Sequence, residues 1–255
     1  MTYSPILAVA TAAFEIVAAA WAFTLRPAAR CGPRHARRAL PPGGRTIART
    51  TGVILLLLAG YQLTEVAICA DVAAAGFLPR LAFILVTWLP ALGLLLIAQI
   101  HRPASRFFYG GAAAMLVASA GMVTWAALDP SFATASVCRA VFAHYVHALP
   151  RFQIYAAYYW AGLLGMVVWS AHGLVVSDPS PRRRWLAHVH VGTLAFVLPS
   201  IALSYVVPSS RGALPSVMCH FALVLALSLT RMLWVMREEP AEASELTRSA
   251  PSARI

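Results

Sequence analysis

Three ionisable residues lie inside apolar stretches of this 255-residue sequence, where an uncompensated charge is costly. Glu15, Glu65 and His220 each belong to a run of apolar residues long enough to cross a lipid bilayer. Ionisable groups inside such runs are rare and mark proton pathways, ligand sites or hydrogen bonds between helices. We therefore expect Glu15 to relay protons, to bind a cationic ligand, or to form a static hydrogen bond with a neighbouring helix.

The second apolar run carries the sharpest pattern of polar residues. Tyr61, Glu65 and Cys69 are spaced four residues apart, so they share one face of a helix. Cys219 and His220 lie near the start of the last apolar run, at the same depth as Cys69. If the two helices are neighbours, Glu65, Cys69, Cys219 and His220 come together.

Three interpretations of this group remain open. Thiolate, imidazole and carboxylate ligands suit copper or zinc, which would make Glu65, Cys69, Cys219 and His220 a metal site. Alternatively, Cys69 forms a disulfide with Cys219 or with Cys138, which is plausible chemistry on an oxidising outer surface. In the third interpretation, the cysteines are small buried apolar residues and Glu65 is a protonated acid hydrogen-bonded to another helix.

Aromatic residues cluster at the start of the fifth apolar run. Tyr155 and Tyr159 are four residues apart and share a helix face. Tyrosines at a helix end are typical of the aromatic belt at a membrane interface. The same pair could instead line a ligand pocket that opens outward.

The composition indicates an integral membrane protein. The chain is 60% hydrophobic and only 11% charged, whereas soluble domains carry about 25% charged residues. Its formal net charge of +11 comes from basic residues placed between apolar runs, so these read as topology signals and not as a nucleic-acid surface. Every basic residue is arginine. A chain without lysine cannot form a Schiff base with retinal, which excludes a retinal pigment.

Seven runs reach the roughly 20 apolar residues needed to span the hydrocarbon. They cover residues 5–25, 51–73, 78–100, 107–128, 152–174, 185–206 and 213–236. We predict an all-α bundle of seven transmembrane helices in one domain over residues 1–236. Residues 237–255 are predicted to form a disordered tail, and residues 136–148 a short helix at the membrane interface.

The arginines predict the orientation of the bundle. Fifteen of the 20 lie in alternate connections and in the C-terminal tail, and Arg231 near the inner end of the last run brings this side to 16. Basic residues concentrate on the cytoplasmic side of membrane proteins. The N-terminus is therefore expected outside and the C-terminus in the cytoplasm of a bacterial cell, with anionic lipid headgroups contacting the basic connections.

Three short stretches carry a resemblance to a group of known sequences. They are residues 61–65 leading to Cys69, residues 88–94 with the sequence WLPALGL, and residues 215–219 with the sequence PSVMC. These resemble stretches of uncharacterised bacterial seven-span membrane proteins. The resemblance implies the seven-helix fold and carries no activity with it.

Three functions are compatible with these features. The first is binding or sensing of a small ligand in a polar pocket in the outer half of the bundle, lined by Glu15, Tyr61, Glu65, Tyr155, Tyr159 and His220. The second is a proton-coupled transporter that uses Glu15 and Glu65. The third is a metal or redox protein centred on the Cys, His and Glu group, although no enzyme motif with defined catalytic residues is found.

Overall fold

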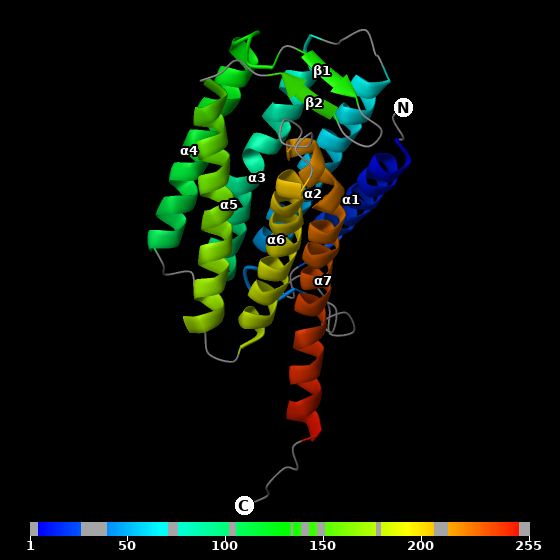
Figure 1. Cartoon of the computed structure of the whole chain (residues 1–255). Coiled ribbons are helices and arrows are strands. Elements are labelled where there is room, and N and C mark those ends of the chain that lie inside the picture. Colours follow the sequence, from blue (N-terminus) through cyan, green and yellow to red (C-terminus); the bar gives the residue numbers. More distant parts are fainter. Residues whose placement is uncertain are drawn as a thin grey trace, which may run out of the picture.

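The computed structural model describes residues 5–26, 40–70, 76–101, 106–133, 135–138, 143–146, 151–176, 180–206 and 214–249. Within these residues the chain forms seven helices and one two-stranded sheet (Figure 1). The helices are α1 (Ile6–Thr24), α2 (Gly44–Cys69), α3 (Leu78–Ile100), α4 (Arg106–Leu128), α5 (Arg151–Val176), α6 (Pro181–Val206) and α7 (Leu214–Ser249). All seven are long and apolar enough to cross a membrane. The prediction of an all-α protein with seven membrane-spanning helices is confirmed to this extent.

The helix boundaries differ from the prediction mainly where polar residues extend a helix. Helix α2 begins at Gly44, seven residues before the start of its apolar run. Gly43 precedes it with a φ of 80°, a left-handed conformation that glycine adopts without steric cost. Helix α6 likewise begins at Pro181 and includes the next three arginines. Arginine is a good helix former, but hydropathy does not detect a helical turn outside the apolar run.

Helix α7 shows the largest difference. The sequence analysis ended this helix at residue 236 and expected a disordered tail, whereas the structure continues it to Ser249. Residues 237–249 contain four Glu, two Ala and two Arg, which favour helix. Extending an existing helix also avoids the unfavourable nucleation step. Residues 250–255 of the predicted tail lie outside the described residues.

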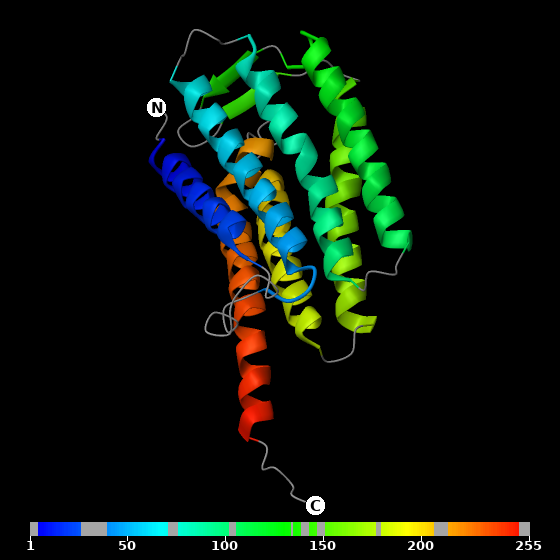
Figure 2. The same cartoon turned by 180° about the vertical axis from the view of Figure 1, so that it is seen from behind.

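The helices pack mainly against their neighbours in the sequence. Helices α1, α2, α3 and α4 form one series of contacts, and α5, α6 and α7 form another. The two series join where α3 contacts α5 and where α7 contacts α1 and α2 (Figures 1 and 2). Helix α3 is the most enclosed of the seven, whereas α4 exposes most of its surface. Exposed apolar side chains such as Val17, Phe107 and Val117 suit a lipid environment.

The connection between α4 and α5 contains a β-hairpin and not the predicted short helix over residues 136–148. Strands β1 (Ala135–Cys138) and β2 (Ala143–Val146) pair antiparallel and lie across one end of the bundle (Figure 1). We call this the hairpin end. Ser136 pairs with Tyr145 in this register. Because side chains alternate along a strand, Tyr145 and Cys138 belong to the same face of the hairpin.

Helices α3 and α5 approach each other closely at Pro90 and Gly162. A Cβ atom on Gly162 would lie 2.3 Å from the Cβ atom of Pro90, closer than packed atoms allow. Pro90 and Pro199 lie inside helices, as the sequence predicted. Glycine at position 162 is therefore required if α3 and α5 are to pack at this distance.

Candidate functional site

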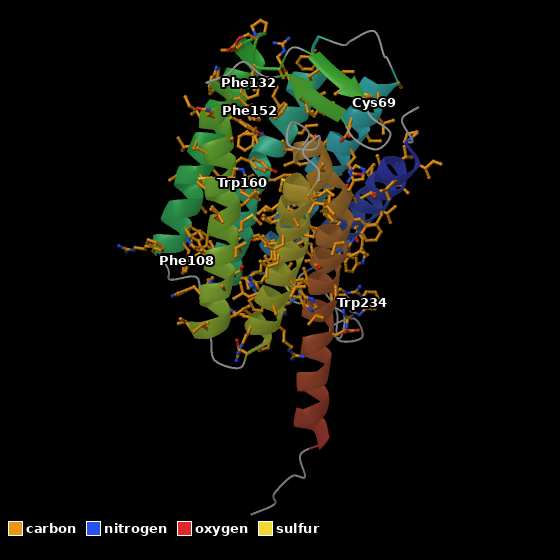
Figure 3. All side chains as sticks on the ribbon, in the orientation of Figure 1. Cys69, Phe108, Phe132, Phe152, Trp160 and Trp234 are labelled. Atoms are coloured by element: carbon orange, nitrogen blue, oxygen red, sulfur yellow. A yellow bond between two sulfur atoms is a disulfide. The ribbon has the colours of Figure 1, made fainter. Side chains whose placement is uncertain are left out.

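The polar face of α2 points toward the hairpin. Tyr61 is fully buried, and its hydroxyl donates a hydrogen bond of 3.3 Å to the hydroxyl of Tyr145 on β2. Two turns further along α2, Cys69 forms a disulfide with Cys138 of β1, with a Cα–Cα distance of 5.7 Å. Glu65 lies between Tyr61 and Cys69 on the same face and is buried. This helix face and the hairpin thus form one connected unit (Figure 3).

The disulfide bears on the interpretations left open by the sequence. Cys69 pairs with Cys138, one of its two candidate partners, so the alternative pair with Cys219 is not formed. A sulfur in a disulfide has no thiolate to offer a metal, which removes Cys69 from the proposed copper or zinc ligand set. In the described part of the chain, no three His, Cys, Asp or Glu residues are grouped to hold a metal ion. The side chain of Cys219 lies outside the described residues.

A cluster of aromatic rings fills the interior beneath the hairpin. The ring of Phe83 on α3 makes edge-to-face contacts with Phe132, Tyr145, Phe152 and Tyr155, at centroid distances of 5.2–5.9 Å. Such pairs contribute about 0.5–1.5 kcal/mol each beyond their buried area. Phe132 and Phe152 lie at the same end of the bundle as Cys69 (Figure 3). The hairpin is therefore held by packing as well as by the disulfide.

Tyr155 belongs to the interior and not to an aromatic belt at the membrane interface. Its side chain is buried, and its hydroxyl is hydrogen-bonded to that of Thr87 at 3.1 Å. Tyr159 stacks against Tyr155 with a centroid distance of 6.0 Å and remains partly exposed. The two tyrosines thus differ in burial, because the rotation of α5 places Tyr155 against Phe83 of α3 and leaves Tyr159 at the edge of the cluster.

A network of hydroxyl groups joins α3, α4 and α5. The Tyr158 hydroxyl donates a 2.6 Å hydrogen bond to the carbonyl oxygen of Thr87, and it also lies 2.6 Å from the Ser119 hydroxyl oxygen. The Thr87 carbonyl lies three residues before Pro90, in the part of α3 where a missing N–H disturbs the helical hydrogen bonds. These hydrogen bonds satisfy polar groups inside the bundle and fix three helices relative to one another.

Helices α1 and α2 share a second polar contact at the depth of Tyr61. Gln62 donates a long hydrogen bond from Nε2 to the carboxyl oxygen Oε1 of Glu15, at 3.4 Å. Glu15 is 0% exposed and Gln62 is 2% exposed. The other oxygen of each group, Oε2 of Glu15 and Oε1 of Gln62, has no hydrogen-bond partner. Gln62 was not among the residues predicted for the site, although an amide inside an apolar run, on the helix that carries Glu65, was an available signal.

Glu65 and His220 lie on helices that contact each other, as the sequence analysis required. Helices α2 and α7 pack along part of their lengths. Glu65 is buried, His220 is half-buried, and both take part in interactions within the protein. Tyr61, Glu65 and Tyr145 thus lie near the hairpin end, and the helix contact brings α7, which carries His220, against α2.

A cavity lies at the centre of the bundle, but its walls are apolar. Its volume is about 20 Å³, close to the space that one water molecule needs. Residues of α2, α3, α5, α6 and α7 line it, among them Ile54, Leu89, Leu163 and Leu225, with Thr193 as a hydroxyl-bearing member. The Thr193 hydroxyl is already bonded to the carbonyl of Val189. This cavity suits helix packing and does not supply the polar pocket predicted from the sequence.

The end of the bundle opposite the hairpin carries histidines and aromatic rings. The ring of His101, just past the end of α3, stacks on Phe108 at 4.4 Å and lies 6.3 Å from that of His172. Burial lowers the pKa of His101, a nearby His172 lowers it further, and a hydrogen bond with the Trp169 carbonyl opposes both effects. The neutral imidazole therefore belongs to the folded arrangement here.

Comparison with known proteins finds no protein-family model and no curated protein that matches this sequence. The seven helices and their apolar surfaces define the class: a multi-pass membrane protein built as a helical bundle.

Proposed function

We propose that this protein binds or senses a small polar ligand through the outer half of its helical bundle, in a bacterial cytoplasmic membrane. The observation that carries the proposal is the polar face of α2, where Tyr61 and Glu65 are buried and Cys69 is bonded to the hairpin through the disulfide. Buried polar groups in a membrane protein cost stability. The concentration of buried polar groups beneath the hairpin therefore favours a ligand-binding site there.

Two independent features support placing the hairpin end outside the cell. Arginines at the opposite end include Arg45, Arg49 and Arg106 in the first turns of α2 and α4, which fits the cytoplasmic side. The disulfide lies at the hairpin end, and disulfides persist in oxidising compartments outside the cytoplasm. The N-terminus then lies outside and the C-terminal end of α7 in the cytoplasm.

The ligand site proposed here is closed in this arrangement of the chain. The hydroxyl oxygen of Tyr145 lies 3.3 Å from that of Tyr61. This hydrogen bond is longer than the usual hydroxyl–hydroxyl distance of about 2.8 Å. A ligand hydroxyl or ammonium group could replace this weak contact if the hairpin shifts. Glu65, His220 and the partly exposed Tyr159 would then contact the ligand, with Tyr155 holding the aromatic wall and Glu15 deeper in the bundle.

Thermal unfolding of the purified protein against a panel of small amines and amino acids tests this proposal. We expect at least one compound to raise the melting temperature of the wild type and of Tyr109→Phe, a tyrosine on α4 remote from the hairpin. The same compound should lose its effect in Tyr61→Phe and Glu65→Gln. An equal response in all four proteins would place the ligand elsewhere.

A second candidate function is a proton-coupled carrier that uses Glu15 and Glu65. The unpartnered carboxyl oxygen of Glu15 inside the bundle favours it, since intramembrane acids often belong to proton pathways. Flux measured in proteoliposomes with an imposed pH gradient tests this candidate. Glu15→Gln and Glu65→Gln should each abolish the gradient-driven component, and flux unchanged in both variants would reject the carrier.

A further inference from the structure

The contact between Glu15 and Gln62 is enclosed on all sides by the bundle. Glu15 is the tenth residue of the 19-residue helix α1, so it lies far from both helix ends. Gln62 lies about 10 Å inside the Cys69 end of α2, given the rise of about 1.5 Å per residue. Both side chains are nearly inaccessible, and residues one turn away, Ala12 and Ala19 on α1 and Leu58 on α2, are buried and apolar. No solvent is available there to satisfy a polar atom.

The hydrogen-bonding groups of the pair are one donor short. The Gln62 amide nitrogen points a hydrogen at Oε1 of Glu15, while Oε2 of Glu15 and Oε1 of Gln62 both lack a partner. Both unpaired atoms are acceptors when the carboxyl is ionised, so neither can satisfy the other. One proton on Oε2 turns that oxygen into a donor. The two groups are then complementary, because a protonated acid and a primary amide can each direct one donor and one acceptor at the other.

The neighbouring ionisable groups do not replace that proton. Helix α1 packs against α2 and α7. In the halves of these helices nearer the hairpin, the ionisable side chains are Tyr61 and Glu65 on α2 and His220 on α7, and in the other halves they include Arg49 and Arg231. None of them supplies a partner to Oε2 of Glu15. A metal ion is also a poor substitute, since cations such as Ca²⁺ take six or more oxygen ligands.

We propose that Glu15 and Gln62 form an intramembrane proton-binding site. With the proton bound, the Oε2–H group of Glu15 donates to Oε1 of Gln62 while Nε2–H of Gln62 donates to Oε1 of Glu15. The second hydrogen bond draws the first contact from 3.4 Å toward the usual 2.9 Å. When the proton leaves, the negatively charged carboxylate of Glu15 and the amide oxygen of Gln62 are both acceptors. They then repel each other, and the contact between α1 and α2 weakens. The ligand of this site is the proton itself.

This inference deepens the carrier candidate, because it names the group that would hold the transported proton. It rests on the contact between α1 and α2 at Glu15 and Gln62, and not on the contact between Tyr61 and Tyr145. The protein could hold this proton without moving it, and the measurement below reports proton occupancy without any transport. If the flux assay shows no transport but the protonated acid is detected, the carrier candidate fails. Glu15 and Gln62 would then still form a proton-binding site that controls the contact between α1 and α2.

Infrared spectroscopy of the whole protein in lipid bilayers tests the proposal. The wild type at neutral pH should show the carbonyl stretch of a protonated carboxylic acid, with the shift expected on transfer to D₂O. Glu15→Gln should lose this band, and Gln62→Leu should shift it toward the frequency of a free acid. Glu65→Gln should retain the Glu15 band.

Gln99→Leu is the matched control for the amide. Gln99 is another glutamine inside the bundle, it donates to the Thr50 hydroxyl at 3.0 Å, and its Oε1 also lacks a partner. Its replacement should leave the band unmoved. If the wild type shows no such band at neutral pH, the proposal is wrong. It is also wrong if the band survives Glu15→Gln, or if it shifts equally in Gln62→Leu and Gln99→Leu.

Discussion

Breaking the disulfide between Cys69 and Cys138 should destabilise the bundle by a measurable and calculable amount. The bond closes a loop with a sequence separation of 69 residues. The loss of chain entropy in an unfolded loop of this length corresponds to about 4 kcal/mol. Helices α3 and α4 contribute 23 residues each to the loop, and a denatured state that keeps these two helices leaves only the rest of the loop flexible. Counting only the remaining third of the loop lowers the expected loss to about 3 kcal/mol.

The assay is unfolding of the purified protein by titration of SDS into mixed micelles. Cys69→Ser, Cys138→Ser and the double variant should each lose the same free energy of unfolding, about 3–4 kcal/mol, because each removes the same bond. Treatment of the wild type with a reductant should reproduce that loss and slow its migration on a denaturing gel. Cys31→Ser, at a cysteine outside the described residues, gives the background effect of a Cys→Ser change.

Two results would refute the reasoning about the disulfide. If the two single variants differ in stability or their effects add in the double variant, then the cysteines act separately and not as one bond. A reductant that changes neither the free energy of unfolding nor the gel mobility would show that the bond is not formed in the protein. Labelling of the reduced cysteines by a membrane-impermeant thiol reagent on intact cells would further report which side of the membrane carries the hairpin.

Three further predictions follow from packing, hydrogen bonding and protonation. Gly162→Ala should lower the free energy of unfolding by about 1–3 kcal/mol, because the new methyl group collides with Pro90. Gly110→Ala is the control, since its Cβ would meet no atom within 4 Å, and it should not lower the free energy of unfolding in the same SDS titration. Tyr158→Phe should cost about 1–3 kcal/mol, because it leaves buried polar partners unsatisfied. Because burial lowers the pKa of His101, acidification should destabilise the protein as pH falls below about 6.5, where the unfolded imidazole protonates first. His101→Gln should flatten this part of the melting-temperature profile, and an unchanged profile would contradict the assignment.

The helices could be predicted from the sequence because a lipid environment imposes a simple rule on each of them. A segment must be apolar over about 20 residues to cross, and this property is local. The shared face of Tyr61, Glu65 and Cys69 was also predictable, since helical spacing alone determines it. The structure places all three toward the hairpin.

The remaining features depend on contacts between distant segments. The hairpin strands have only four residues each, too few for a period of two to be told from a helical turn. The role of Gln62 depends on its contact with Glu15, which lies on another helix. The interior position of Tyr155 depends on the rotation of α5 about its axis, which local sequence does not determine. The partner of Cys69 could not be predicted from the sequence either, because the pairing with Cys138 or Cys219 depends on how distant segments pack.

The buried polar atoms without partners are distributed unevenly among the helices. In the described part of the chain they belong to Glu15 on α1, Thr51 and Gln62 on α2, Gln99 near the end of α3, and Arg237 on α7. The hydroxyl groups that link α3, α4 and α5 are instead hydrogen-bonded. A helix whose polar groups are all satisfied can only lose hydrogen bonds by moving, whereas a helix with unsatisfied groups can gain them. A shift of α4 or α5 would therefore break hydrogen bonds that the bundle already makes, whereas a shift of α1 relative to α2 can bring the unpartnered oxygens of Glu15 and Gln62 within reach of new donors.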